Sequence, residues 1–107
     1  MRNILIVGAG RSSAALVRYL LKKSFEEDLN LIIADISVEN ANSLVMGHEN
    51  SSVVELDIFN IESRKKLVKN ADIVVSMLPA RFHLEIAKDC LDFKKNLVTA
   101  SYISEDL

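Results

Sequence analysis

Short apolar runs alternate with longer amphipathic stretches from one end of the chain to the other. The first run, Ile4–Val7, is rich in β-branched residues and contains no polar residue, which is typical of a strand buried on both faces. Similar runs recur further along. The pattern predicts five strands, at Ile4–Val7, Leu29–Ala34, Val53–Leu56, Ile73–Met77 and Asn96–Thr99.

The stretches between these runs have the spacing of helices with one apolar side. Polar residues mark where two of them begin, since Ser12 or Ser13 and Ser37 can accept a hydrogen bond from a first helical turn. Asn60 or Ile61 opens the third helix. The predicted helices run from Ser12 or Ser13 to Lys23 and over Val38–Met46, Ile61–Val68 and Phe82–Phe93. Five strands joined by four helices indicate an α/β fold, with a doubly wound parallel five-stranded sheet and helices on both faces.

The same spacing assigns single side chains of the later helices to a face. The basic residues Arg64–Lys66 are expected on the solvated side of the third helix. The fourth helix has a wide apolar face that includes Leu84 and Leu91, and Cys90 on this face is expected to pack as a small hydrophobic residue. His83, in the first turn, is expected to be packed or solvated rather than an acid–base group.

Composition narrows the class of protein. The chain has 107 residues, of which 50% are hydrophobic and 26% charged, and its formal net charge is −2. These values are typical of one globular domain without electrostatic attraction to nucleic acid or anionic membranes. A single cysteine and two histidines provide neither a disulfide nor a metal centre. No membrane span of about 20 apolar residues and no signal peptide is found, so we expect a cytoplasmic protein.

The strongest local motif is the glycine loop after the first strand, Gly8-Ala9-Gly10-Arg11-Ser12-Ser13. Gly8 permits a tight turn, and Gly10 lets a pyrophosphate approach the backbone at a helix N-terminus. Ser13 stands where the fingerprint has Gly or Ala, and it is small enough for close packing. Because the loop follows a buried strand and opens a helix, it predicts a dinucleotide-binding Rossmann domain with strand order 3-2-1-4-5.

Asp35, at the end of the second strand, lies near the offset of about 20 residues at which this fingerprint has an acidic residue. A carboxylate there accepts hydrogen bonds from the adenosine ribose and repels a 2′-phosphate, so Asp35 favours NAD over NADP. The alternative is an Asp that supports the start of the next helix, although Ser37 can do this instead. Arg11 can pair with a phosphate of either cofactor, so NADP is not excluded.

Two further segments are candidates for cofactor contact. Asp57 follows the third strand and is placed to approach the adenine edge, but a turn-forming Asp fits that position almost equally well. Ser76, Met77, Leu78 and Pro79, at the end of the fourth strand, are expected along the ribose and nicotinamide side of the crevice. A strand end followed by a helix start would explain Pro79 equally well.

Two segments in the second half of the chain carry a family resemblance. One joins Ser76-Met77-Leu78-Pro79 to the pair Phe82-His83, and the other is Val98-Thr99-Ala100-Ser101-Tyr102-Ile103-Ser104. Together with the glycine loop they resemble the N-terminal cofactor domain of the saccharopine dehydrogenase (saccharopine reductase) family. Enzymes of this family use a nicotinamide cofactor to make or oxidise the secondary amine saccharopine in lysine metabolism.

The resemblance implies roles for several residues. Ser76 and the peptide at Met77-Leu78 would line the cofactor, Thr99 and Ala100 would also contact it, and Ser101 and Tyr102 would approach the amino-acid substrate. The resemblance covers nearly the whole chain, so residues 1–107 are expected to form one cofactor domain of a longer enzyme. The family's substrate-binding and dimerising domain is absent, and we expect this chain alone to bind cofactor with little or no turnover.

The chain departs from the family pattern at two places. Glu105-Asp106-Leu107 follows Ser104 where the family commonly has Pro-Ala-Met. NADP-using members usually lack an acidic residue at the position of Asp35 and often have Arg next to it, where this chain has Ile36. The second departure supports NAD as the expected cofactor.

Two other functions fit part of the sequence. Within the same superfamily, the substrate would be a polyamine-like imine, as in carboxynorspermidine dehydrogenase. A non-enzymatic alternative is a nucleotide-sensing Rossmann domain like those that gate potassium transport, which share the glycine loop and the acidic residues after the second and third strands. Such a sensor does not account for the segment Ser101–Ser104.

Overall fold

Strands and helices alternate along the chain as the sequence predicts. The computed structural model describes residues 2–8, 11–24, 26–45, 49–78 and 82–99. The strands are β1 (Arg2–Val7), β2 (Leu29–Asp35), β3 (Ser51–Glu55), β4 (Ile73–Ser76) and β5 (Asn96–Thr99). The helices are α1 (Arg11–Lys23), α2 (Val38–Val45), α3 (Ile61–Asn70) and α4 (His83–Asp92). Every predicted element is present, and the ends differ from the prediction by two residues at most.

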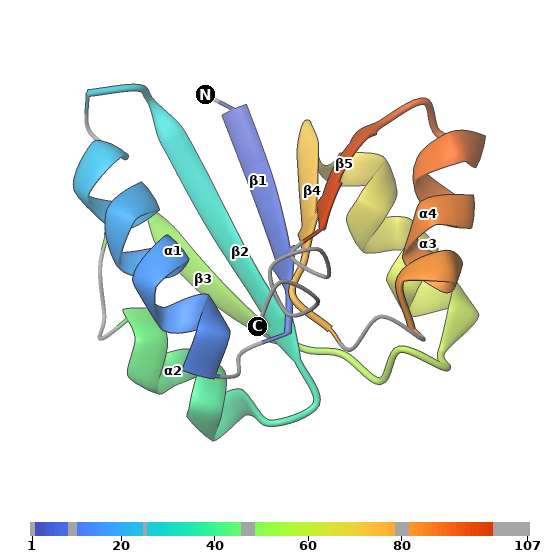
Figure 1. Cartoon of the computed structure of the whole chain (residues 1–107), viewed down its shortest axis with the longest axis horizontal. Coiled ribbons are helices and arrows are strands. Elements are labelled where there is room, and N and C mark those ends of the chain that lie inside the picture. Colours follow the sequence, from blue (N-terminus) through green and yellow to red (C-terminus); the bar gives the residue numbers. More distant parts are fainter. Residues whose placement is uncertain (1, 9–10, 25, 46–48, 79–81, 100–107) are drawn as a thin grey trace, which may run out of the picture.

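The strands form one sheet in the order β3-β2-β1-β4-β5, and each pairs with its neighbours in parallel (Figure 1). This confirms the predicted fold class and strand order. Val7 at the end of β1 pairs with Ala34 of β2 and with Ser76 of β4. Because all strands point the same way, their carboxyl ends share one edge. Successive strands are added on one side of β1 up to β3 and on the other side from β4 onward, so the strand order reverses between β1 and β4. Ligands of doubly wound sheets bind at such a switch point.

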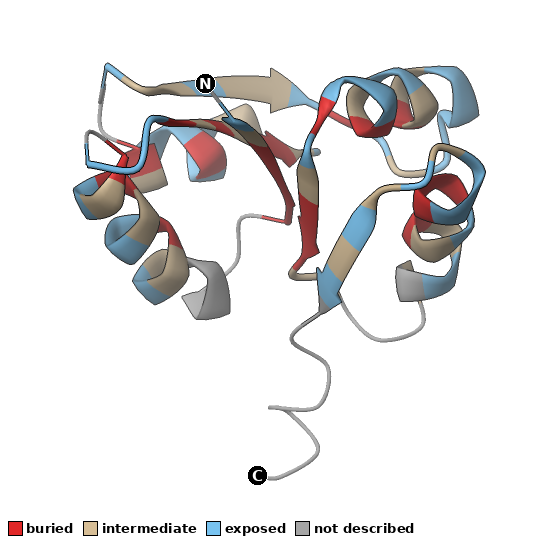
Figure 2. Ribbon diagram, turned by 90° about the horizontal axis from the view of Figure 1, so that it is seen from above, coloured by how far each residue is buried: buried red, intermediate tan, exposed pale blue. Residues whose placement is uncertain are grey.

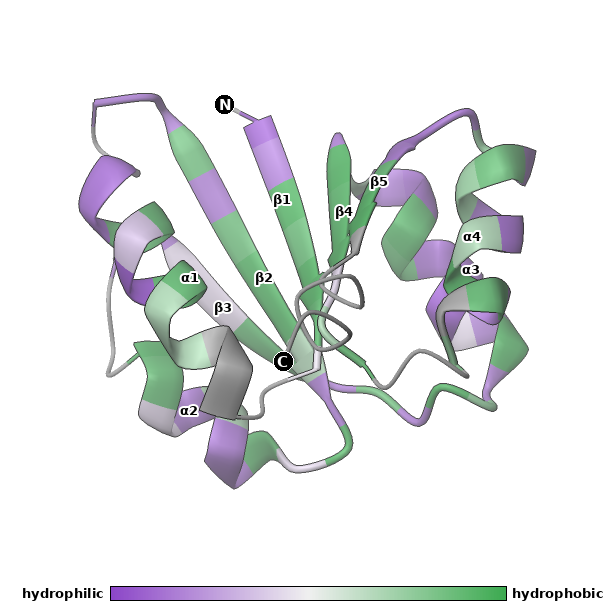
Figure 3. Ribbon diagram, viewed as in Figure 1, coloured by the Kyte–Doolittle hydropathy of each residue, from purple (hydrophilic) through white to green (hydrophobic). Residues whose placement is uncertain are grey.

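Two apolar layers hold the helices against the two faces of the sheet (Figure 2). One layer packs α1 and α2 against the sheet, with Val17, Leu31 and Ile33 fully buried. The other packs α3 and α4 against the opposite face, with Val68, Val74 and Ile86 at its centre. β1, β2 and β4 are hydrophobic over most of their length (Figure 3). This arrangement explains the continuous apolar runs of β1 and β4.

Side-chain hydrogen bonds cap the first turns of α2 and α3. The Ser37 hydroxyl accepts a hydrogen bond from the backbone N–H of Asn40 at 3.2 Å, and the Asn60 side chain accepts from that of Ser63 at 3.1 Å. Ser37 therefore caps α2 as predicted. Of the two residues expected to open α3, Asn60 is the cap and Ile61 the first helical residue. The prediction for α1 was wrong, because the helix begins at Arg11 and includes Ser12 and Ser13 in its first turn. Neither serine precedes the helix.

The wide apolar face predicted for α4 is only partly correct. Ile86 and Cys90 are buried against the sheet, but Leu84 and Leu91 are 60% and 78% exposed. Residues two positions apart on a helix lie roughly 200° apart around its axis, so the prediction merged two opposite sides of α4 into one face. Among the helices of the described segments, none has the length and apolar character needed to cross a membrane.

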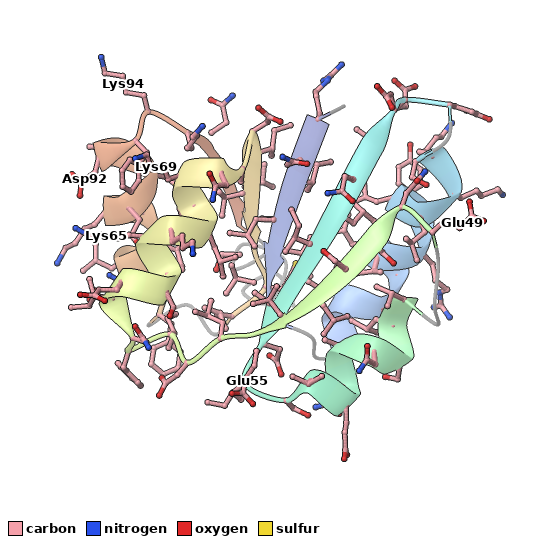
Figure 4. All side chains as sticks on the ribbon, turned by 180° about the vertical axis from the view of Figure 1, so that it is seen from behind. Glu49, Glu55, Lys65, Lys69, Asp92 and Lys94 are labelled. Atoms are coloured by element: carbon pink, nitrogen blue, oxygen red, sulfur yellow. The ribbon has the colours of Figure 1, made fainter. Side chains whose placement is uncertain are left out.

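The basic residues of α3 also differ from the prediction. Lys66 is exposed and Lys65 lies on the outer side, where its Nζ is 3.8 Å from Asp92 Oδ2 (Figure 4). Arg64, however, is buried and pairs with the buried Asp89 of α4. The prediction of a wholly solvated basic face was therefore wrong for Arg64, because its side chain turns toward α4 and finds a carboxylate there.

Candidate cofactor-binding site

The switch point between β1 and β4 is built around Gly8. Its backbone N–H donates to Ala34 O at 2.8 Å, and the N–H of Met77 donates to Val7 O at the same distance. Gly8 has φ +104°, and a Cβ placed on it would lie 3.2 Å from the carbonyl carbon of Met77. Glycine is therefore required both for the backbone angle and for the close approach of β4. The backbone angle at Gly8 is one that a tight turn needs, while residues 9 and 10 of the predicted turn lie outside the described residues.

The glycine loop leads directly into α1 on the same edge of the sheet. The first backbone N–H groups of a helix have no partner within it, so those at Arg11, Ser12 and Ser13 belong to the orphan donors of α1. Such a terminus attracts anions through its N–H groups and its dipole. Gly10 lies outside the described residues, as do the side chains of Arg11, Ser12 and Ser13. The strand end before Gly8 and the helix start at Arg11 stand where the fingerprint has them.

Asp35 is the last residue of β2, at the same edge. Its side chain is half-buried, and Asp35 Oδ2 accepts a hydrogen bond from the backbone N–H of Ser37 at 2.9 Å. The carboxylate thus supports the turn into α2, while Ser37 caps the helix itself. A carboxylate can accept several hydrogen bonds at once, so this turn is compatible with a contact to a ribose hydroxyl.

Asp57 follows β3 in an exposed turn. Its Oδ1 accepts from the N–H of Phe59 at 3.0 Å, and its carbonyl oxygen accepts from the N–H of Asn60 at 2.8 Å. The turn-forming interpretation of Asp57 is therefore correct. The turn also holds the carboxylate at the carboxyl edge of the sheet, and the second carboxylate oxygen has acceptor capacity for an adenine amine.

The end of β4 forms the other wall of the switch point. Ser76 is fully buried and pairs with Val7 on one side and Thr99 on the other. Met77 and Leu78 are half-buried and lie against Gly8. Ser76, Met77, Leu78 and Thr99 are thus brought to the edge where the sequence predicts cofactor contact. Pro79 and the predicted cofactor and substrate residues Ala100, Ser101 and Tyr102 lie outside the described residues.

One acidic residue at this edge escaped the sequence analysis. Glu55 ends β3 and pairs in register with Asp35 of β2. Side chains alternate between the faces along a strand, so residues in register point to the same face, and neighbouring strands are about 5 Å apart. Two carboxylates therefore flank the predicted ribose position. Only the pairing register of β2 and β3 could have revealed the second one.

Among the described residues outside this edge, neither the cysteine nor a cluster of metal-binding side chains forms a second candidate site. Cys90 is 3% exposed, and burial together with the adjacent Asp89 carboxylate raises the pKa of its thiol. The thiol is therefore neutral and a poor nucleophile. Among the described residues, His, Cys, Asp and Glu side chains do not gather in groups of three or more that could hold a metal ion. The side chain of His83 is outside the described part.

Known proteins share this arrangement over almost the whole chain. The family model for the saccharopine dehydrogenase NADP-binding domain matches residues 4–107. The chain belongs to this family. It is 33% identical to the alpha-aminoadipic semialdehyde synthase of Arabidopsis thaliana, over 97% of this chain and 11% of that protein. It is 28% identical to the saccharopine dehydrogenase [NADP(+), L-glutamate-forming] of Saccharomyces cerevisiae, over 99% of this chain and 23% of that protein.

A solved structure has the same fold. The apo saccharopine dehydrogenase (L-Glu forming) of Saccharomyces cerevisiae superimposes with a TM-score of 0.84 and 25% identity, over 95% of this chain and 22% of that one. The chain thus spans between about a tenth and a quarter of the length of these relatives. The family membership predicted from the sequence is confirmed, and the domain is one that binds a nicotinamide dinucleotide.

Proposed function

We propose that this chain is the NAD-binding domain of a longer oxidoreductase that resembles saccharopine dehydrogenase. The whole enzyme would act on the C–N bond of a secondary amine amino acid in lysine metabolism. The family match over residues 4–107 supports this proposal, and so do the relatives whose names describe saccharopine dehydrogenases. The family match also favours an enzyme over a nucleotide sensor. The substrate domain, and any dimer it forms, would lie in the rest of the enzyme.

Each part of a dinucleotide would find one contact at this edge of the sheet. The pyrophosphate would lie against the loop from Gly8 and Gly10 to Arg11, Ser12 and Ser13, at the α1 N-terminus. The donor set fits, because backbone N–H groups face an anion while carboxylates stand where hydroxyl groups must be bound. Asp35 would bind the adenosine ribose, and Asp57 would accept from the adenine amine. The single observation that carries the proposal is this switch-point geometry between β1 and β4.

The nicotinamide half would lie beyond the pyrophosphate, over the ends of β4 and β5. Ser76, Met77 and Leu78 would line it, with Thr99 and Ala100 on the far side, and Ser101 and Tyr102 would approach the substrate. The bound cofactor supplies a nicotinamide ring that accepts or donates a hydride. The protein's part is to hold that ring against the substrate carbon and to keep water away from it.

We infer that the cofactor is NAD, although the family and the yeast relative are named for NADP. Asp35 and Glu55 end neighbouring strands in register, so two carboxylates would stand beside the proposed ribose position, where a 2′-phosphate would add two further negative charges. Ile36 is 65% exposed and offers no cation at the position next to Asp35. Each of these features opposes a 2′-phosphate and leaves a 2′-hydroxyl unaffected.

Calorimetric titration of the chain with NAD(H) and NADP(H) tests this choice. We expect tighter binding of NAD(H) and a reversal in the double variant Asp35→Ser/Ile36→Arg, which replaces a repulsive carboxylate with a phosphate-binding cation. Since hydrogen bonds to charged groups contribute about 1.5–3 kcal/mol, the affinity ratio should shift by at least about tenfold. Tighter NADP(H) binding by the unmodified chain would refute the role of Asp35.

Glu55→Gln should raise NADP(H) affinity a few-fold and leave that for NAD(H) unchanged, because one exposed charge pair is worth less than about 1 kcal/mol. Glu49→Gln is the matched control. Both residues are exposed, but they lie at opposite ends of β3 (Figure 4). An equal effect of the two substitutions would show that overall charge, and not the carboxyl edge, discriminates against the 2′-phosphate.

A further inference from the structure

Arg64 and Asp89 form a buried ion pair between α3 and α4. The side chains are 5% and 1% exposed. Arg64 Nε donates to Asp89 Oδ2 at 2.5 Å, and Nη2 donates to Asp89 Oδ1 at 3.4 Å. Glu85 Oε2 is 3.9 Å from Nη2 and is itself 40% exposed. Such a pair is costly to bury, and apolar side chains of similar volume often stabilise a core equally well or better.

The guanidinium makes one contact that an apolar side chain could not replace. Arg64 Nη1 donates to the carbonyl oxygen of Ile58 at 2.9 Å. Ile58 belongs to the turn that connects β3 to α3, directly after Asp57. Its side chain packs partly against the α3/α4 layer, whereas Asp57, Phe59 and Asn60 are exposed. The other hydrogen bonds within this turn are local, from the N–H groups of Phe59 and Asn60 to Asp57. Arg64 therefore ties the backbone of the turn to the helix layer.

This turn is linked to a second segment at the same edge. The ring of Phe59 packs edge-to-face against that of Phe82, with centroids 5.9 Å apart. Phe82 directly precedes α4, the helix that carries Asp89. The buried pair thus joins two helices to the turn after β3, and the aromatic contact connects that turn to the start of α4.

We propose that Arg64, oriented by Asp89, is a positioning residue for recognition of the adenine base. It holds the Ile58 peptide so that the Asp57 carboxylate meets the exocyclic amine of adenine. This inference rests on the proposed cofactor function, and it adds a determinant of base specificity that lies beneath the site and does not touch the cofactor.

The test compares NAD with nicotinamide hypoxanthine dinucleotide, in which a carbonyl oxygen replaces the adenine amine. The unmodified chain should bind NAD about tenfold more tightly, because Asp57 loses a hydrogen-bond donor and faces an acceptor in the analogue. In Arg64→Met/Asp89→Leu, this preference should fall below about threefold through weaker NAD binding, with little change for the analogue. The apolar pair should preserve the thermal midpoint.

The neighbouring ion pair provides a matched control. Lys65 and Asp92 join the same two helices on the exposed side, at 3.8 Å, with side chains 44% and 61% exposed. Lys65→Met/Asp92→Leu should therefore keep the full preference for adenine. Asp57→Asn should reduce the preference by itself and add little in the Arg64→Met/Asp89→Leu background, since both changes remove the same interaction.

A single substitution covers the case in which the double variant fails to fold. Arg64→Lys keeps a cation beside Asp89, but one ammonium group cannot reproduce the guanidinium fork that reaches both Asp89 and Ile58. It should show the same loss of preference. Equal weakening of both dinucleotides would overturn the inference, because it would show a merely structural role. An unchanged preference for adenine would also overturn the inference, but NAD binding by the unmodified chain would still support the proposed function. If the unmodified chain bound neither dinucleotide, the proposed function would fall as well.

Discussion

At the scale of single residues, the switch point depends on the absence of a Cβ atom at Gly8. Gly8 lies where β1 turns toward α1, and any Cβ there would be 3.2 Å from the Met77 carbonyl carbon and 3.3 Å from its oxygen. Both contacts are with backbone, which cannot move aside as a flexible side chain would. The positive φ adds strain for every residue other than glycine.

Gly8→Ala should therefore lower the free energy of unfolding by about 1–3 kcal/mol, the cost of a residue held in a sparsely populated backbone region. Urea unfolding followed by circular dichroism measures the effect. Repeating the substitution in a Leu78→Ala background separates the two causes, because Leu78 Cδ2 is the side-chain atom among the three heavy atoms nearest to the added Cβ, at 3.4 Å. The same loss is expected in both backgrounds. Recovery in the second would attribute the strain to Leu78 and not to the backbone.

At the scale of elements, α3 begins with a cap at Asn60, one of the two residues that the sequence offers as the start of this helix. The side chain of Asn60 accepts a hydrogen bond from the N–H of Ser63, and the backbone N–H of Asn60 donates to Asp57 O. One residue thus connects the turn after β3 with the first turn of the helix. The helix also carries Glu62 in its first turn, where the helix dipole favours an acidic side chain.

Asn60→Ala should destabilise the domain by about 1 kcal/mol, because the first turn of α3 loses its side-chain acceptor. Asn60→Asp, which keeps an acceptor at the same position, should unfold at nearly the same urea concentration as the unmodified chain. The comparison of the two midpoints is the measurement. Equal destabilisation by both substitutions would mean that the amide group, and not the cap, stabilises this region.

At the scale of the whole molecule, one sheet is shared by two apolar layers. Ile33 points into the α1/α2 layer and Val74 into the α3/α4 layer, and both are fully buried. Because β1 contributes to both layers, with Ile4 and Ile6 on one side and Leu5 and Val7 on the other, neither layer can open without disturbing the other. A domain of this size has a total stability of only about 5–15 kcal/mol.

Ile33→Ala should remove about 2–5 kcal/mol and should also expose Cys90, although the two residues lie in opposite layers. Labelling of the Cys90 thiol by a disulfide reagent at constant pH measures this exposure. If the layers unfold together, labelling should accelerate by the factor that corresponds to the loss of global stability from urea unfolding. Glu49→Gln serves as a neutral control. An unchanged labelling rate would show that the α4 layer opens independently.

The predictable part of the molecule is the part that local pattern controls. Continuous apolar runs are buried strands, the helical spacing between them predicts crossovers, and right-handed crossovers allow few strand orders. The glycine loop and Asp35 were found because the fingerprint lies within one strand–helix–strand unit. The cap at Ser37 was equally visible, since a cap involves residues only three positions apart.

Tertiary contacts decided what the pattern left open. A periodic spacing tells which side chains share a side of a helix, but not which side meets the sheet, so Arg64 is buried while Leu84 and Leu91 are exposed. Glu55 stands beside Asp35 because two strands separated by a helix pair in one particular register. The sequence by itself therefore determined the order of elements and the family. Only packing between distant segments decided which charges are buried together and which gather at the cofactor edge, because both depend on neighbours that no local period encodes.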